Sequence, residues 1–308
     1  MRAFYFPCVP DSGWLEGVLP GVGPAEAPVA GRKFIDWTLE AAGRFGVDSA
    51  VLVDKRISPE LEHRFAIDRD GLCAVSTMRL AKGLPRSLSE VIASPWFRGI
   101  AEADSSVTVL WGNALPFYDV AAAKYEPVPE PLLGETPAGI YHWCGGKWLR
   151  PAAGAAAMRD AASWLDISMR LLEGEGSYTL PGYSAEKGVY ICRNVVMELG
   201  TEVHKPVMLL DDAWCSRNVR LERAVVGAGA FVGEGAKLVR TMVCDGTFVG
   251  EGLDLEGKIV AGGRVIDAAT GTWVDIEESG MVRGVSRAPR WVRAIGRFLA
   301  GSSFRRRP

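Results

Sequence analysis

The hydrophobic positions between residues 191 and 266 recur at a nearly constant spacing. An apolar side chain stands at every sixth position, or every fifth at one corner, so that three steps span 18 residues once and then 17 residues three times. Each step fits a short strand followed by a corner, and Gly-rich corners such as 227–229 and 233–235 suit backbone that cannot stay extended. The fourteen anchor positions are Ile191, Met197, Val203, Leu209, Cys215, Leu221, Val226, Val232, Leu238, Val243, Val249, Leu255, Val260 and Ile266.

Three steps close one triangular turn of chain, and stacked turns bury a continuous apolar column. The spacing therefore predicts a β-solenoid over residues 189–278. Ordinary antiparallel strands with tight turns are the alternative, but they favour period-two alternation and irregular spacing. The pattern also resembles the hexapeptide repeat of left-handed parallel β-helices, and the left hand is what that resemblance implies.

The first 150 residues show the pattern of an α/β domain with a parallel sheet. Residues 3–6 form a predicted strand that two prolines end, and an amphipathic helix is expected from Phe34 to Phe45. Residues 49–53 read as a buried strand, so strand, loop, helix and strand follow one another. Residues 126–139 are an expected acidic, Pro-rich connector, and 151–188 an expected linker with a helix between Ala152 and Glu173.

Four segments of this domain resemble the sugar-1-phosphate nucleotidyltransferases. They are PVAG at 28–31, FIDWTLE at 34–40, GVD at 46–48 and VTVLWGN at 107–113. The resemblance implies a Rossmann-like nucleotidyltransferase domain, and the same family often carries a hexapeptide β-helix after it. It further implies a role in sugar-nucleotide metabolism, with polysaccharide synthesis as a natural setting.

The residues that grip phosphate in that family are replaced here. The family's two loop glycines fall on Val9 and Asp11 and its arginine on Gly13, while its lysine falls on Pro24 and its metal-binding aspartate on Asn113. Since the family's chemistry depends on neutralising phosphate charge, we expect impaired catalysis, no catalytic residue and no cofactor. The expected ligand is a sugar nucleotide or a sugar phosphate. The alternative is an active, Mg²⁺-dependent enzyme, in which a shifted alignment would use Arg32 or Lys33.

Two short segments supply candidate substrate-binding residues. Gly112 and Asn113 are carried over from the resemblance, whereas Gly145, Gly146 and Lys147 stand between two tryptophans. A glycine pair beside aromatic and cationic side chains suits a sugar or phosphate pocket. A turn whose aromatics pack into the core is the competing interpretation.

His204, in the predicted solenoid, raises a second class of function. Hexapeptide acyltransferases rely on a coil histidine as a base. Here no carboxylate is evident near His204 and no long loop for an acyl carrier is evident in the coils, so an acyltransferase is the less favoured alternative. His63 and His142 lack companion ligands and are expected to be structural.

Composition narrows the remaining classes. The formal net charge of −2 argues against bulk attraction to nucleic acid, and the six cysteines show no CxxC spacing. No run of about 18 apolar residues occurs, so a cytoplasmic protein is expected. Oligomer formation, including a homo-oligomer, is left open.

Residues 279–308 have a different character, with eight arginines and no acid. Trp291, Ile295, Phe298 and Leu299 share one helical face, so a basic amphipathic tail is expected. Such a tail suits an anionic membrane surface, which would make the protein membrane-peripheral, or an acidic protein partner. A helix that caps the solenoid is the alternative.

Overall fold

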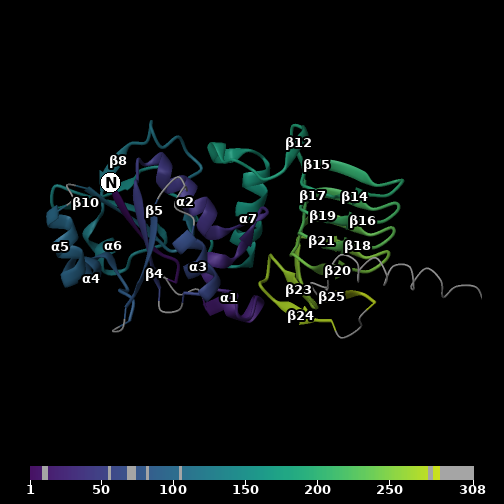
Figure 1. Cartoon of the computed structure of the whole chain (residues 1–308), viewed down its shortest axis with the longest axis horizontal. Coiled ribbons are helices and arrows are strands. Elements are labelled where there is room, and N and C mark those ends of the chain that lie inside the picture. Colours follow the sequence, from purple (N-terminus) through teal and green to yellow (C-terminus); the bar gives the residue numbers. More distant parts are fainter. Residues whose placement is uncertain are drawn as a thin grey trace, which may run out of the picture.

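The computed structural model describes residues 1–8, 13–54, 57–67, 74–80, 83–103, 106–276 and 280–284, and its fold is mixed α/β. A seven-stranded sheet with helices on both faces lies at one end of the molecule, a stack of short strands lies at the other, and α7 lies between them (Figure 1). The helices are α1 (Gly13–Val18), η1 (Pro24–Glu26), α2 (Phe34–Arg44), α3 (Pro59–Ile67), α4 (Leu88–Ala93), α5 (Pro95–Ala103), α6 (Glu130–Gly134), α7 (Ala161–Leu172) and η2 (Glu175–Ser177).

The seven-stranded sheet has the order β5-β4-β1-β6-β9-β10-β8. Its first four strands pair in parallel, and each of the last three pairs antiparallel with the strand before it. Successive side chains of β1 point to opposite faces. Ala3 and Tyr5 therefore pack toward α2 and α7, whereas Phe4 and Phe6 pack toward α4 and α5. The strands are β1 (Arg2–Phe6), β4 (Ser49–Asp54), β5 (Ala74–Arg79), β6 (Ser106–Trp111), β8 (Tyr125–Pro127), β9 (Gly139–Cys144) and β10 (Lys147–Pro151).

The predicted strands and helix of this part lie where the hydrophobic pattern put them, but two segments differ. The expected connector 126–139 instead contains β8 at the sheet edge and α6, because Glu126 and its neighbours pair with β10. The expected linker helix begins only at Ala161, where Asp160 and Ser163 form a reciprocal cap. Before it, β11 (Ala156–Ala157) pairs with β7 (Ala114–Leu115), and β2 (Pro28–Val29) pairs with β3 (Arg32–Lys33).

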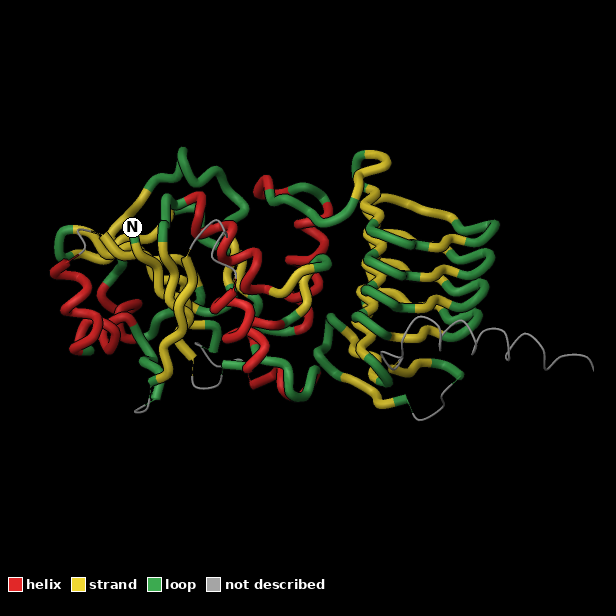
Figure 2. Tube along the Cα trace, viewed as in Figure 1, coloured by secondary structure: helices red, strands yellow, loops and turns green. Residues whose placement is uncertain are grey.

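Figure 2 shows the stack of short strands, which is built from two sheets. Their strands from β13 to β22 pair in parallel, in a register that repeats every 17 or 18 residues. One inner column runs Ile191, Leu209, Val226, Val243 and Val260, and two more begin at Met197 and Val203. The predicted anchor spacing is therefore the observed register up to Val260. The strands are β12 (Tyr183–Glu186), β13 (Val189–Ile191), β14 (Val196–Met197), β15 (Glu202–Leu209), β16 (Trp214–Cys215), β17 (Arg220–Val226), β18 (Phe231–Val232), β19 (Lys237–Val243), β20 (Thr247–Val249), β21 (Asp254–Glu256), β22 (Lys258–Ala261), β23 (Arg264–Asp267), β24 (Trp273–Asp275) and β25 (Val282–Gly284).

The last predicted anchor, Ile266, does not continue the parallel register. A Gly262–Gly263 turn reverses the chain after β22, so β23 and β24 run antiparallel and Ile266 pairs with Ile259. Glycine suits the first position of this tight reversal because Gly262 adopts a φ of 60°. The solenoid prediction over 189–278 thus fails from residue 262 onward.

The outward side chains divide the stacked strands into three faces. On the buried face, Met208, Val225, Met242 and Ile259 stand in register and pack into the core that includes α2 and α7. The charged face carries a register of Glu202, Arg220, Lys237 and Asp254, with His204 and Glu222 beside it. The aromatic face carries a register of Val196, Trp214, Phe231 and Phe248.

Close approach of backbone and side chains holds the α/β part against the buried face. Gly31, with a φ of 80°, lies so near this face that an added Cβ would stand 2.5 Å from Leu210 Cδ2. Trp164 of α7 donates from Nε1 to the Pro28 carbonyl. Ser168 of the same helix donates from its hydroxyl to the Met242 sulfur. One hydrophobic core therefore runs from the seven-stranded sheet through α7 to the stacked strands.

Glu40 of α2 clamps the segment that leads from α7 into the stacked strands. Its carboxylate accepts hydrogen bonds from Arg32 Nη1 at 2.6 Å, the Thr179 backbone N–H at 2.8 Å and Arg44 Nη2 at 3.2 Å. Arg44 in turn donates to the Ser177 carbonyl at 2.7 Å. Burial alone would raise the pKa of Glu40, but Thr179, Arg32 and Arg44 outweigh it and lower that pKa.

We expect Glu40→Gln to lower the free energy of unfolding by about 2 kcal/mol near pH 7, because a charged acceptor of three hydrogen bonds is lost. A carboxyl with a lowered folded-state pKa stabilises above its unfolded pKa and loses that contribution as pH falls through the folded value. The difference between wild type and variant should therefore shrink below about pH 4. Urea unfolding at several pH values measures it. Glu60→Gln, at a highly exposed partner of Lys33, is the control and should cost little; a pH-independent difference for Glu40→Gln would contradict the assignment.

Candidate functional site

The carboxyl ends of the parallel strands β1, β4 and β6 meet at one edge of the seven-stranded sheet. The chain moves from β1 outward to β4 and β5 and then returns to β6 on the other side of β1. Crevices that bind ligands in open α/β sheets lie beyond such carboxyl ends, at the point where the strand order reverses. Cys8, Asp54 and Asn113 follow or end these strands, so we take this edge as the candidate site.

Asn113 is built into the protein interior at this edge. Its side chain is 3% exposed, Nδ2 donates to the Pro24 carbonyl at 2.6 Å, and Oδ1 accepts from the Tyr5 hydroxyl. Its backbone carbonyl accepts from the Met158 N–H at 2.7 Å. Asn113 and Pro24 are thus joined by a neutral hydrogen bond.

Cys8 and Asp54 form a second pair beside Tyr5. The Cys8 thiol donates toward both carboxylate oxygens of Asp54, at 3.2 Å each, and Asp54 is 5% exposed. Burial is the main cause that raises the pKa of Tyr5 well above its ordinary value, with Cys8 and Asp54 adding to it. Tyr5 therefore stays a neutral donor to Asn113. The sequence analysis did not select Tyr5, Cys8 or Asp54 as site residues. Their positions in or next to the ends of the predicted strands 3–6 and 49–53 were the available signal.

Arg32 and Lys33, the two cations that the active-enzyme alternative would use, are paired with acids. Lys33 donates to Glu26 at 2.9 Å and to Glu60 at 3.3 Å. Burial alone would lower the pKa of Lys33, but the two glutamates outweigh it and raise that pKa. Arg32 is held by Glu40, and Val9 and Asp11 lie outside the described residues. The Arg32 and Lys33 side chains are therefore already neutralised within the protein.

The candidate residues from the second segment lie at the opposite end of the sheet. Gly112 follows the carboxyl end of β6 and donates its N–H to the Phe6 carbonyl at 2.9 Å. Gly145 and Gly146 instead form the two-residue turn between β9 and β10, beside Ser106 at the start of β6, with φ values of 56° and 81°. Both positive values match a type I′ hairpin turn. The structure does not bring the two candidate segments together.

The aromatics around that turn belong to a packed cluster. Phe97 stacks on Trp148 with ring centroids 5.7 Å apart and meets Trp143 at 6.0 Å. Lys147 is exposed at the turn itself. These contacts support the interpretation of a turn with packed aromatics.

The histidines take different roles from one another. His142 Nδ1 and the Thr108 hydroxyl share a hydrogen bond of 3.0 Å. Burial lowers the pKa of His142 to about 4, which fits a structural residue. His204 stands on the charged face with Nε2 3.5 Å from Glu202 Oε2. The expectation that no carboxylate lies near His204 is therefore wrong. The strand brings Glu202 to the same side two residues earlier.

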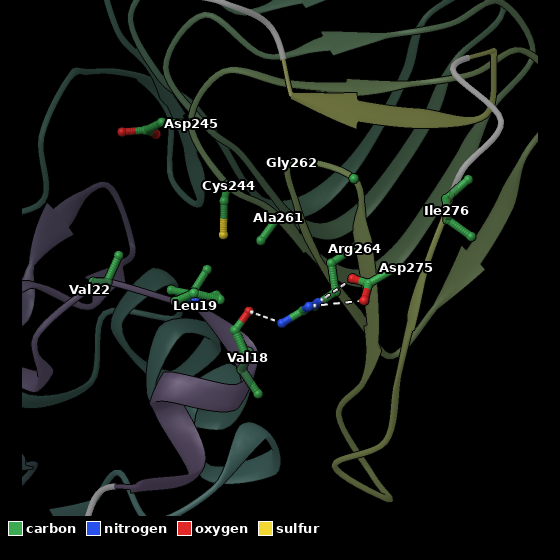
Figure 3. A pocket seen from close by; sticks show the side chains of 12 residues that line it. Val18, Leu19, Val22, Cys244, Asp245, Ala261, Gly262, Arg264, Asp275 and Ile276 are labelled. Carbon is green, nitrogen blue, oxygen red and sulfur yellow. Dashed lines mark hydrogen bonds and ion pairs between the residues drawn. The ribbon is translucent and has the colours of Figure 1, made fainter.

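A cavity of about 500 Å³ lies at the seam between the two parts of the molecule (Figure 3). It is lined by Leu19 and Val22 from the α/β part and by Cys244, Arg264 and Asp275 from the other. The arginine of this cavity is already hydrogen-bonded within the protein. Arg264 Nε and Nη2 donate to the two Asp275 carboxylate oxygens, and Nη1 donates to the Gly17 carbonyl. Burial raises the pKa of Cys244 to about 12, so its thiol stays protonated. Among the described residues that line the cavity, no cation other than the paired Arg264 is present.

Within the described ranges, no three His, Cys, Asp or Glu side chains are placed to share a metal ion, and no helix is long and apolar enough to cross a bilayer. No protein-family model matches the chain, and no curated protein matches it.

Proposed function

We propose that this chain is a nucleotidyltransferase-like protein that binds a sugar nucleotide or sugar phosphate without turning it over. In this proposal residues 1–150 are a Rossmann-like nucleotidyltransferase domain and residues 189–261 are a left-handed parallel β-helix. The parallel strand order of the first part and the 17-residue register of the second support it. Synthesis of a surface or extracellular polysaccharide is the proposed setting.

One observation supports the proposal that the protein does not turn its ligand over. Asn113 and Pro24 stand where the resemblance places a metal-binding acid and a phosphate-binding lysine, and they are hydrogen-bonded to each other. Nucleotidyl transfer needs charge placed against the reacting phosphates, since that chemistry depends mostly on positioning and electrostatic stabilisation. A neutral, buried contact supplies neither a metal ligand nor a cation. Binding makes the smaller demand, because backbone N–H groups can donate hydrogen bonds to a phosphate without catalysing transfer.

The strand-end edge is the proposed binding place. Ligands of open α/β sheets occupy the crevice outside the carboxyl ends of the strands. Cys8 and Asp54 border that place, and a carboxylate there favours the hydroxyls of a sugar over a bare phosphate. The sugar half of the ligand is therefore proposed to lie toward Asp54.

The test uses the full chain and two readouts. Pyrophosphate release is measured with each common nucleoside triphosphate, hexose 1-phosphates and Mg²⁺, and none is expected. The melting temperature is measured with nucleoside triphosphates, hexose 1-phosphates, UDP-glucose, GDP-mannose and dTDP-glucose. At least one sugar nucleotide or sugar phosphate is expected to raise it without Mg²⁺, because a ligand that binds only the folded state stabilises it.

Asp54→Asn should weaken that shift, and Asp166→Asn, an acid on the exposed side of α7, should leave it unchanged. Pyrophosphate release would establish the active-enzyme alternative. A melting temperature that no nucleotide, sugar nucleotide or sugar phosphate moves would leave a scaffolding role as the better account.

A further inference from the structure

The aromatic face of the stacked strands is a ladder of rings that ends at an arginine. Trp214 and Phe231 stack with centroids 6.5 Å apart, and Phe231 and Phe248 stack at 5.3 Å with their planes 6° apart. Arg283 of β25 continues the register, with its guanidinium carbon 4.8 Å from the Phe248 ring centre. All three rings remain half-buried on the outside of the sheet.

The corners that border this face are acidic on both sides. Asp211, Asp212 and Asp245 follow the buried face at one border, and Glu198, Glu234 and Glu251 precede the charged face at the other. Two arginines stand among these six acids, Arg193 against Asp211 and Arg217 against Glu234. The borders therefore carry four more carboxylates than cations, on either side of an apolar strip.

The last described segment, 280–284, lies at the β20 end of the aromatic face. β25 pairs antiparallel with β20 as the last strand of the aromatic sheet, and Val282 fills the inner column while Arg283 faces outward. Residues 285–308 continue from Gly284 and lie outside the described residues. They contain seven arginines, no acid, and the apolar residues Trp291, Ile295, Phe298 and Leu299.

We propose that residues 285–308 of this same chain dock along the aromatic face. Their apolar residues would cover the ring ladder, and their arginines would meet the acidic borders, which matches both the hydrophobicity and the sign of charge. Distance allows it, because the strip from Phe248 to Val196 crosses three strand spacings, about 15 Å, and about ten helical residues span that length. The tail is thereby an intramolecular cover for one face of the solenoid, independent of nucleotide binding.

Trypsin cleavage after Arg290, Arg293 and Arg297 tests the proposal. The quantity measured is the cleavage rate of the full chain divided by that of a synthetic 285–308 peptide. Docked arginines are cleaved only when the tail opens, so we expect cleavage at least about tenfold slower in the full chain. Phe231→Thr with Phe248→Thr should restore most of the peptide rate. Glu222→Thr with Val239→Thr, two register neighbours on the charged face, is the matched control and should stay protected.

A second pair of variants tests the charge contacts separately. Glu198→Gln with Glu251→Gln removes two border acids, and Glu202→Gln with Glu256→Gln removes two acids of the charged face from the same coils. Only the first pair should speed cleavage, by about fivefold.

Cleavage of the full chain as fast as the peptide would overturn the proposal, as would equal effects of the two glutamine pairs. Protection that appears only with phosphatidylglycerol vesicles would assign the tail to a lipid surface, and protection that grows with protein concentration would assign it to a second copy. Either result would overturn intramolecular docking.

Discussion

Asn113→Asp is expected to lower the free energy of unfolding by about 3 kcal/mol at neutral pH. The change replaces a buried amide donor by a carboxylate oxygen that faces the Pro24 carbonyl, so an attractive contact becomes repulsive. Burial and this carbonyl should raise the folded-state pKa of the new acid. A raised pKa destabilises most at pH above that value, and the loss shrinks as pH falls toward the unfolded pKa of about 3.9.

Denaturant unfolding at about pH 8 and about pH 5 measures this effect, and the larger loss is expected at the higher pH. Asn194→Asp makes the same chemical change at an exposed corner of the stacked strands and should cost close to nothing. Asn113→Asp also tests the proposed loss of catalysis, because Tyr5 and Pro24 still surround position 113. Mg²⁺-dependent pyrophosphate release by Asn113→Asp would show that a single missing charge, rather than the packing around it, prevents turnover.

Gly227→Ala is expected to destabilise the stacked strands by about 3 kcal/mol, since it forces a methyl group into close-packed backbone. An added Cβ at Gly227 would stand 2.5 Å from Asp245 N and 2.5 Å from the Cys244 carbonyl carbon, both backbone atoms of the next coil. Backbone atoms cannot rotate away as a side chain does. The coils must separate locally, and the inner column loses contact there.

Gly257→Ala is the matched control from a later corner. It has a φ of 63° and open space around the new Cβ, so only the conformational cost of about 1 kcal/mol is expected. Thermal unfolding followed by circular dichroism compares the two variants, together with hydrogen exchange of the Leu209 to Val243 strands. Equal losses for Gly227→Ala and Gly257→Ala would show that the coil spacing yields more easily than these distances indicate.

The spacing of apolar residues was sufficient to predict the stacked strands, because each inner position has to be apolar whatever surrounds the molecule. Leu221 and Leu238 are fully buried in one column for that reason. Local patterns likewise placed β1, α2 and β4, since their periodicity and their glycine and proline boundaries act within a few residues. The candidate site was less accessible to such reasoning. The resemblance selected Asn113, but its contacts with Tyr5 and Pro24 join residues 108 and 89 positions apart.

The amino-acid order alone determined that the second half of this chain forms short strands at a regular step, because a six-residue period of buried side chains is a local, repeating constraint. Only the tertiary structure decided which of its three faces is buried, which is charged and which presents an aromatic ladder. Met208 and Met242 are outward-facing residues that become core only because α7 packs on them. In the same way, Gly145 and Asn113 lie at opposite ends of β6 because antiparallel pairing of β9 with β6 sends the β9–β10 turn to the far edge of the sheet.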